Sequence, residues 1–516
     1  MRRQEIQLLA VARQGDVAAR CEVGRRYLSG TDGFPRHPPT GLSYLSHPSV
    51  ACAPQASVIV AENMELDELL SMGQEQPLRR AAGLGCTTAQ IKLATWTLIR
   101  EGASGEGLSL LMAAKRAHSA AATKALAVLG SRSVEDCLAE VLAALLSSYP
   151  TCVYPLIVRA GREAHGKGDL LALLRCLRLA SSTRDSPGPE LAELSVAAAL
   201  LAEHLGASAL GLPPAWIEAQ LEQASAAGCR AAGYVLGRAL CEVACNTLPA
   251  ATLAGHANVR KGAALLLRSA DGGCEEAWMH LYRLHADNRS SVANLQMARF
   301  FLEKAALCGF SEAQRKLGAL LLREAASLAE SEAAIQWLSR AAGAGDLLAA
   351  GLLRTLVLPW PGSDEDAAAA IKVIQRSDPW LAVRLRLSRD FGLTKLEALT
   401  VDPAEGERPW GLVVGKNKFV AQARLAAPRA IPALDPASLT NLRRAALFFE
   451  QARGEPGGIE GDLRKRSFTQ RRSFDRHGLL ETMFFAQAAS ARLDALRQGS
   501  KWAFQTREPL RQALAA

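Results

Sequence analysis

A spacing pattern that recurs along the chain constrains its fold more than any other feature of the sequence. Each copy is centred on one residue, with Leu seven positions before it, Ala or Ser four before, Ala four after and Leu eight after. Full copies are centred on Gly85, Gly228, Gly273, Gly309 and Gly345, a conservative copy on Gly15, and a looser copy on His118. The last four of the glycines are 45, 36 and 36 residues apart. A long-period repeat of this kind predicts an array of similar structural units.

The spacing within each copy predicts a pair of helices. Apolar residues three or four positions apart lie on one face of a helix, so each half of the template marks one apolar helix face. The central glycine falls between the two helices and can adopt the left-handed conformation that ends the first one. The small Ala residues let neighbouring helices approach closely. Because one pair cannot bury its own apolar face, successive pairs must stack.

Several segments resemble the Sel1-like repeat family, which is related to the tetratricopeptide repeats. Val23–Gly30 is similar to the Sel1 element L-G-x-x-Y-x-x-G, while Ala334–Ala342 and Ala298–Ala306 resemble its A-x-x-W-L-x-x-A-A element. The spacing of 36 residues also fits Sel1 better than the standard tetratricopeptide unit. The resemblance covers roughly residues 5–130 and 215–355. Few copies keep the Tyr and the second Gly of the full motif, so the repeats are degenerate.

The resemblance implies an all-α fold, a right-handed superhelix of α–α pairs. Of the 60 basic residues, 47 are Arg and 13 are Lys, a bias that is typical of a GC-rich bacterial genome, so we expect a bacterial protein. Sel1-like proteins are commonly adaptors that assemble complexes in signalling, secretion or protein quality control. We therefore expect a non-enzymatic scaffold whose concave groove, lined by the first helix of each pair, binds a partner protein or peptide. The exposed side chains expected to contact that partner are Tyr234, Trp278, Tyr282, Gln314 and Arg315.

Changes in composition and in the match to the repeat template divide the chain into four segments. Residues 1–130 hold N-terminal repeats interrupted by a proline-rich insertion at 31–57, which we expect to break the helical pattern. Residues 131–214 are helical in composition but match the template poorly, with room for about three drifted repeats between His118 and Gly228. Residues 215–358 hold the second block of repeats, and 359–516 form a C-terminal module of mixed, mostly helical structure.

The C-terminal module is expected to contain both helices and a small hairpin. The expected helices are Asp364–Arg376, one starting at Trp380, Ser438–Arg453 and Leu479–Arg497. Two short β-like runs, Trp410–Val414 and Lys418–Ala423, flank Gly415–Asn417 and predict a hairpin near 410–423. The run Gly411–Asn417 differs from a phosphate-binding loop, since it has three residues between its glycines and Asn after the Lys. We interpret it as the hairpin turn.

Positive charge gathers in the C-terminal module. The net charge is +9, and residues 401–516 hold 19 Lys and Arg against 12 Asp and Glu, which gives +7. The sharpest local feature is the stretch 464–477, whose phenylalanines, Phe468 and Phe474, lie among basic residues. Those basic residues are Arg464, Lys465, Arg466, Arg471, Arg472 and Arg476. Arginine can bind phosphate or carboxylate in bidentate fashion, and an aromatic ring can stack on a base.

Three interpretations of this basic stretch stay open. It can bind an acidic protein or peptide, or it can bind nucleic acid. It can also be a solvated loop or helix entry with both phenylalanines in the core. No recognised nucleic-acid-binding fold surrounds it.

The remaining motifs favour no catalytic or metal site. Cys241 and Cys245 could share a metal on one helix face, but no nearby Cys or His pair completes four ligands, so we expect no metal and no cofactor. No constellation for acid–base or nucleophilic catalysis is visible, and an enzyme with its site in the C-terminal module stays an alternative.

The sequence also gives expectations about location. The start of the chain does not resemble a signal peptide, and no run of 18 apolar residues predicts a membrane span. The 11 cysteines show no paired spacing. We expect a cytoplasmic protein with reduced thiols.

Overall fold

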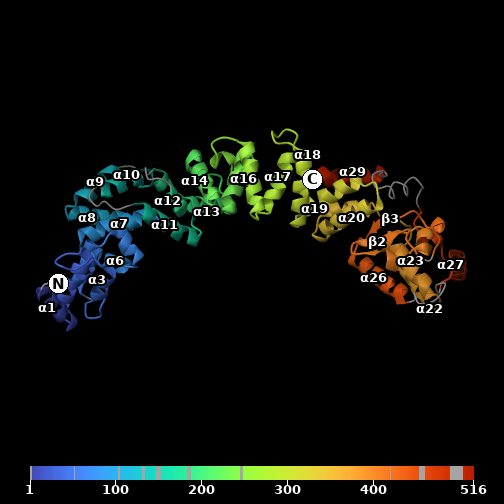
Figure 1. Ribbon diagram of the computed structural model, residues 1–516, viewed down its shortest axis with the longest axis horizontal. Helices are drawn as coiled ribbons and strands as arrows, with labels where there is room; N and C mark the ends of the chain where they lie inside the picture. Colours follow the sequence, from blue (N-terminus) through green and yellow to red (C-terminus); the bar gives the residue numbers. More distant parts are fainter. Residues whose placement is uncertain are drawn as a thin grey trace. The chain divides into compact units, whose positions relative to one another are not determined.

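The computed structural model describes residues 3–50, 53–102, 105–130, 134–146, 153–182, 188–243, 248–418, 420–451, 460–487 and 504–515. In these ranges almost all of the regular secondary structure is helical, which confirms the predicted all-α class (Figure 1). The chain divides into two compact units, Met1–Ala277 and Trp278–Ala516. The division falls inside the repeat block expected at 215–358. Our division into four segments stays a proposal, as does the handedness of the array.

The first unit consists of helices joined mostly by short turns. They are α1 (Arg3–Arg13), α2 (Val17–Ser29), α3 (Pro38–Leu45), α4 (Pro54–Asn63), α5 (Leu66–Ser71), α6 (Glu75–Gly83), α7 (Thr87–Glu101), α8 (Gly105–Arg116), α9 (Ala120–Leu129), α10 (Val134–Leu146), α11 (Val153–Lys167), α12 (Leu170–Ser182), α13 (Pro189–Leu205), α14 (Pro214–Ala226), α15 (Arg230–Leu240), the 3-10 helix η1 (Ala250–Thr252) and α16 (Val259–Asp271). The division between the units lies within α17 (Glu276–Ala286).

The second unit continues the helix pairs and then adds the C-terminal module. Its elements are α18 (Leu295–Leu307), α19 (Ser311–Glu324), α20 (Leu328–Gly343), α21 (Leu347–Arg354), α22 (Asp364–Ser377), α23 (Pro379–Phe391), α24 (Lys395–Thr400), α25 (Pro403–Gly406), β1 (Glu407–Arg408), β2 (Gly411–Val414), η2 (Gln422–Arg424), β3 (Arg429–Pro432), α26 (Pro436–Gln451), α27 (Leu463–His477), η3 (Glu481–Met483) and α29 (Phe504–Ala515).

The template residues form the turns and the core, as predicted. The central glycines of the five full copies have φ between 87° and 99°, and His118 has φ 62°, so all adopt the left-handed conformation. The residue after each centre donates its backbone N–H to the carbonyl of the template Ala or Ser, as in Cys229 to Ala224 (2.9 Å) and Asp346 to Ala341 (3.0 Å). The template Leu and Ala side chains are buried. One hydrogen-bonded cap therefore ends the first helix of each pair.

A drifted copy of the template lies in the segment 131–214. The turn between α11 and α12 is centred on Gly168, with φ 68°, and Asp169 donates to the carbonyl of Ala164 at 2.9 Å. Ala164 and Ala172 occupy the template positions four before and four after. The outer Leu positions hold Gly161 and Cys176 instead, which explains why the sequence pattern failed to reveal this pair.

The proline-rich insertion was expected to break the helical pattern, and that expectation is wrong. Helix α3 begins with Pro38 and Pro39, and α4 begins with Pro54. A proline in the first turn of a helix has no N–H that the helix needs, and its fixed φ suits that turn. The prolines therefore start these helices, and His37 accepts a hydrogen bond from the backbone N–H of Thr40.

The strand prediction was right for β2 and wrong for its partner. Strand β2 pairs antiparallel with both β1 and β3, and β3 lies at Arg429–Pro432, not at Lys418–Ala423. The connection between β2 and β3 runs from Gly415 to Pro428 and includes η2. It is therefore longer than the predicted hairpin turn.

The small sheet is buried on both faces. Leu412 and Val414 of β2 belong to the core of the C-terminal module, together with Phe391 and Leu442. Val413 points into the other core, formed by α19, α20 and α21. Successive side chains of a strand point to opposite faces, so this one strand joins the last repeats to the module.

The helix predictions for the module are partly confirmed. Helices α22, α23 and α26 match the expected positions. The helix expected at Leu479–Arg497 is wrong over 479–487, where only the short η3 occurs, and residues 488–503 lie outside the described part. The additional helix α29 packs against α19 and α21 (Figure 1).

Candidate partner-binding surfaces

The five repeat residues expected to line a groove lie on different helices from those predicted. Tyr234 is on α15, Trp278 and Tyr282 are on α17, and Gln314 and Arg315 are on α19. Each of these is the second helix of its pair. Trp278 and Gln314 are both 8% exposed and Arg315 is 4% exposed, so the expectation that they are exposed is wrong. The physical reason is clear for α19, which packs against α18, α20 and α29 and has little free surface.

The buried members of this set make contacts within the array. Gln314 donates to the carbonyl of Ala306 at 3.2 Å. In an earlier copy, Gln90 donates in the same way to the carbonyl of Ala82. Both glutamines stand five residues after the central glycine, so the sequence contained a signal for this structural role. Trp278 packs against Phe301, with ring centroids 5.9 Å apart.

Arg315 contacts the chain's own C-terminal helix. Its Nε forms an ion pair with Asp346 at 2.9 Å, and its Nη1 donates to the carbonyl of Ala513 in α29 at 2.9 Å. Leu510 and Ala513 of α29 are buried in the same core. In this structure a segment of the same chain satisfies the guanidinium that we had expected to contact a partner.

The two tyrosines are half-buried beside cations. Lys316 lies over the ring of Tyr282, at 5.6 Å from the centroid, and Arg238 lies over Tyr234, at 4.5 Å. These cation–π contacts stabilise the local packing. The partner-binding role of all five repeat residues stays a prediction.

The basic stretch 464–477 forms helix α27, and one face of it anchors the helix to the module. Phe474 is buried and packs against Phe484, with centroids 5.5 Å apart. Gln470 is fully buried and donates to Glu481 at 3.3 Å. Arg466 donates to the carbonyl of Leu399 at 3.0 Å. Residues 466, 470 and 474 are four positions apart, so they share the inward face.

The inward position of Arg466 changes its expected role. Its side chain is 10% exposed and lies 3.7 Å from Glu460. Burial lowers the pKa of this guanidinium, and the nearby Arg384 lowers it further. Arg466 is therefore a packing residue of the module, which corrects its place among the exposed partner-binding candidates.

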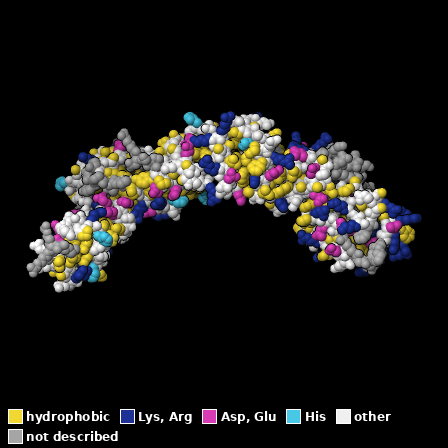
Figure 2. All heavy atoms as spheres, viewed as in Figure 1, with side chains coloured by type: hydrophobic (Ala, Val, Ile, Leu, Met, Phe, Trp, Pro, Cys, Tyr) yellow, Lys and Arg dark blue, Asp and Glu magenta, His cyan; other side chains and the backbone are white. Residues whose placement is uncertain are grey.

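The outward face of α27 places an aromatic ring among cations. Phe468 is 64% exposed, so the interpretation that put both phenylalanines in the core is wrong for this one. Arg464, Lys465, Arg471 and Arg472 stand three or four positions before and after it, the positions that neighbour a residue on a helix surface. We call these five residues the Phe468 face. Figure 2 shows Lys and Arg side chains gathered over this segment.

The cations of the Phe468 face are not held in ion pairs within the described part of the chain. None of the four forms an ion pair with a described residue. Arg476 is also exposed, one turn further along, beside the exposed Asp475. Arg471 lowers the pKa of Glu481, although the main cause of that shift is the hydrogen bond from Lys395. The face therefore presents free positive charge around an apolar centre.

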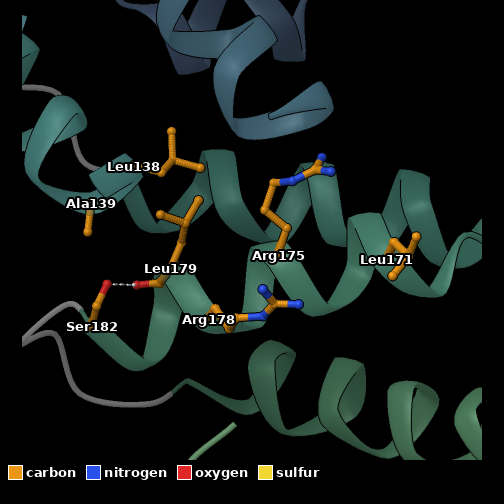
Figure 3. Close-up of a pocket in the computed structure, with 7 residues that line it drawn as sticks. All are labelled: Leu138, Ala139, Leu171, Arg175, Arg178, Leu179 and Ser182. Atoms are coloured by element: carbon orange, nitrogen blue, oxygen red, sulfur yellow. Dashed lines mark hydrogen bonds between the residues drawn. The ribbon is translucent and has the colours of Figure 1, made fainter. Parts of the chain in front are cut away.

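A cavity of about 300 Å³ lies between α10 and α12 in the first unit (Figure 3). Two of its lining residues, Arg175 and Arg178, point in different directions. Arg175 donates to the carbonyl of Arg100 at the end of α7. The guanidinium of Arg175 therefore already has a hydrogen-bond partner within the chain. Ser182, on the rim of the cavity, is followed directly by residues outside the described ranges. The cavity therefore defines no site.

The described residues contain no group of three or more His, Cys, Asp or Glu side chains placed to hold a metal ion. Cys241 forms no disulfide, while Cys245 lies outside the described residues. Cys86, Cys229 and Cys274, which follow the central glycines, are half-buried. Over the same ranges, no helix is long and apolar enough to cross a membrane.

No family model matches the chain, and no curated protein matches it. Two solved structures resemble it. One is a protective antigen of uropathogenic Escherichia coli with an SLR fold, at 15% identity and TM-score 0.28, covering 94% of this chain and 98% of that one. The other is a Sel1 repeat protein from Oxalobacter formigenes, at 18% identity and TM-score 0.25, covering 69% of this chain and 91% of that one.

Both of these proteins carry the type of repeat that the sequence resembles. At such TM-scores neither structure adds evidence about this chain. The helix pairs resemble Sel1 repeats in their own residues, spacing and turns.

Proposed function

We propose that this chain is a non-enzymatic protein-interaction scaffold that holds an acidic segment of a partner protein on the Phe468 face. The scaffold role is supported by the array of helix pairs, since stacked pairs present extended surfaces. A setting in bacterial signalling or secretion rests on the family resemblance alone.

The observation that supports the Phe468 face is an exposed phenylalanine with four unpaired cations around it. Carboxylates bind arginine through charge-assisted, often bidentate, hydrogen bonds. The ring offers apolar contact to a Leu or aromatic side chain within the same segment. Aromatic residues and arginines are the side chains most often responsible for affinity at protein interfaces. The preferred ligand is therefore an acidic peptide that contains at least one large apolar residue.

Nucleic acid is the weaker candidate for this surface. Single-stranded nucleic acid is usually bound in a basic groove where several aromatic side chains stack on successive bases. The described residues of α27 offer one exposed aromatic ring on a convex helix.

The test measures binding of labelled peptides to the full chain by fluorescence anisotropy. The probes are short Glu- and Asp-rich peptides with or without a central Leu, and a single-stranded oligonucleotide. We expect the Leu-containing acidic peptide to bind best. Arg471→Gln together with Arg472→Gln should weaken its binding about tenfold, because each replaced guanidinium loses a charge-assisted hydrogen bond.

A matched control removes the same charge elsewhere. Arg354 and Arg376 are exposed and form no ion pair with a described residue, so their double Gln variant should bind as the wild type does. Phe468→Ala should abolish the preference for the Leu-containing peptide. Peptide binding unchanged in both α27 variants would refute the proposal. Tighter, steeply salt-dependent binding of the oligonucleotide would assign the face to nucleic acid instead.

A further inference from the structure

A second cavity lies in the C-terminal module, away from the Phe468 face. It has a volume of about 300 Å³, is open to solvent on one side and is lined by residues of α22, α23 and α26. Helix α23 packs against each of the other two. The volume is at the lower end of the range for small-molecule sites, which is about 300–1,000 Å³. The cavity therefore suits a ligand not much larger than one amino-acid residue.

The floor of this cavity is apolar. Ile371 of α22, Ala382 and Leu387 of α23 and Ala445 of α26 line it and are all buried. Phe448 is half-buried on the wall. A ligand that enters must place an apolar group on these side chains, because a polar group would lose its hydrogen bonds to water there.

Two arginines on different helices add positive charge to the wall. Arg386 comes from α23 and Arg444 from α26. Neither guanidinium forms an ion pair with a described residue, although Arg386 lies close enough to Asp390 to offset part of the rise that burial causes in the pKa of that carboxyl. Arginines at a cavity wall that keep their donors available select for carboxylate or phosphate oxygens.

A third polar group on the wall is held in place. The side-chain amide of Asn441 donates from Nδ2 to Oδ2 of Asp390 at 2.9 Å. That bond fixes the orientation of the amide, whose Oδ1 atom can accept a hydrogen bond. Gln375 on α22 contributes a second amide. The wall therefore combines two cationic donors with amides that can pair with a neutral polar group.

From this arrangement we infer that the cavity between α22, α23 and α26 binds an apolar group carrying a carboxylate. The apolar body lies on Ile371, Ala382 and Leu387. The carboxylate is held by Arg386 and Arg444, and Asn441 accepts from an adjacent N–H. Two sources share this chemistry: a free small acid such as an acylated amino acid, and the C-terminal residue of a peptide.

The experiment measures binding to the full chain by isothermal titration calorimetry. The small-acid probes are N-acetyl-alanine, N-acetyl-leucine and N-acetyl-phenylalanine, each compared with its carboxamide. The peptide arm uses a Gly/Ser hexapeptide ending in Leu or Phe, with a free or amidated C-terminus. We expect the free acids of Leu and Phe to bind at least tenfold more tightly than their carboxamides.

Variants separate the cavity from nonspecific charge. Arg386→Gln and Arg444→Gln should each weaken binding at least tenfold, while Val383→Phe, on the half-buried wall, should block it with both arginines present. Arg376→Gln, an exposed charge on α22 outside the lining, should change nothing. Circular dichroism checks that each variant is folded.

The possible outcomes decide the proposal. If the small acids and the hexapeptides bind with comparable affinity, the cavity recognises only a single acylated residue. If the hexapeptide binds clearly more tightly, the ligand is the C-terminus of a peptide. Failure of every free acid to bind at millimolar concentration overturns the inference, as does equal binding of acid and carboxamide. Unchanged affinity in both folded arginine variants also overturns it. Substitutions on the Phe468 face leave all these results unchanged, so the two proposals fail independently.

Discussion

The ion pair between Arg429 and Glu397 is the most deeply buried charge pair among the described residues. Arg429 is 1% exposed and Glu397 is fully buried. Arg429 donates to both carboxylate oxygens, at 2.8 and 3.0 Å, and to the carbonyl of Gly392. Burial alone would raise the pKa of Glu397, but the guanidinium holds it below the usual value. The pair joins α24 to β3 at a position that water does not reach, so neither charge could be solvated if its partner were removed.

Glu397→Gln should destabilise the second unit by about 3–5 kcal/mol, since it leaves the charge of Arg429 buried and unpaired. Denaturant unfolding monitored by circular dichroism measures the loss. Arg443→Gln is the comparison, because Arg443 is exposed and lies 3.8 Å from Glu407. An exposed pair contributes only about 0–1 kcal/mol. Similar losses in the two variants would contradict the buried-pair explanation.

Asp390 should make the stability of the module depend on pH. Burial raises its pKa to about 6, whereas an unfolded Asp titrates near 4. Between these values the folded state binds a proton that the unfolded state releases, so this group's contribution to stability falls as pH rises through that window. Asp390→Asn should therefore be more stable than the wild type at pH 7.5, with the difference shrinking toward pH 4.5. A difference independent of pH would show that Asp390 keeps an ordinary pKa.

At the scale of elements, the sequence was most informative where one residue controls a turn. The central glycines predicted the helix pairs because few other residues adopt the left-handed conformation at low cost. The same approach missed the pair at Gly168, where the outer leucines are absent, and missed β3. Arg429 in β3 pairs with Glu397, a partner 32 residues away that no local pattern reveals.

The candidate surfaces were predicted less well than the turns. The sequence revealed the basic stretch, but it did not show which of its side chains point inward. Arg466 is buried because it contacts Leu399, Phe474 is buried because it packs on Phe484, and Phe468 is left on the outer face of the helix. The burial of Arg315 depends on α29, almost 200 residues later in the sequence. The cavity between α22, α23 and α26 depends on three helices brought together by the fold.

Gly309→Ala tests the turn directly. Gly309 has φ 96°, and a β-carbon added there would meet no atom within 4 Å, so any cost comes from the backbone conformation. We expect a loss of about 1–2 kcal/mol. Gly343→Ala is the matched variant, since Gly343 is helical and equally uncrowded, and should be neutral or slightly stabilising. Thermal unfolding of both variants measures the difference, and an unaffected Gly309 variant would refute the turn's requirement for glycine.

At the scale of the whole molecule, the repeats of the second unit pack against the sheet of the C-terminal module. Trp410 and Val413 pack with Leu352 and Leu356 of the last repeat, and Leu510 of α29 covers the same core. An ion pair between Arg408 and Glu332, at 2.8 Å, joins β1 to α20. The module is therefore part of the structure that completes the array.

Truncation after Leu358 should expose the core that the sheet and α29 cover. Ala319, Leu322, Leu352 and Leu356 would then lose their apolar contacts. We expect increased binding of a hydrophobic dye and a lower midpoint of thermal unfolding than in the full chain. A truncated chain that matches the full chain in both measurements would show that the repeats complete their own core.

The two-faced burial of β2 also limits how homologous chains can differ in length. Inserting or deleting one residue within Gly411–Val414 would turn every later side chain of the strand to the opposite face. Leu412 and Val413 would exchange cores, and both would be mispacked at once. The described residues of the segment 416–425 that follows are mostly exposed, and no strand register constrains them. Length variation among relatives of this chain should therefore be concentrated after the strand and absent from it.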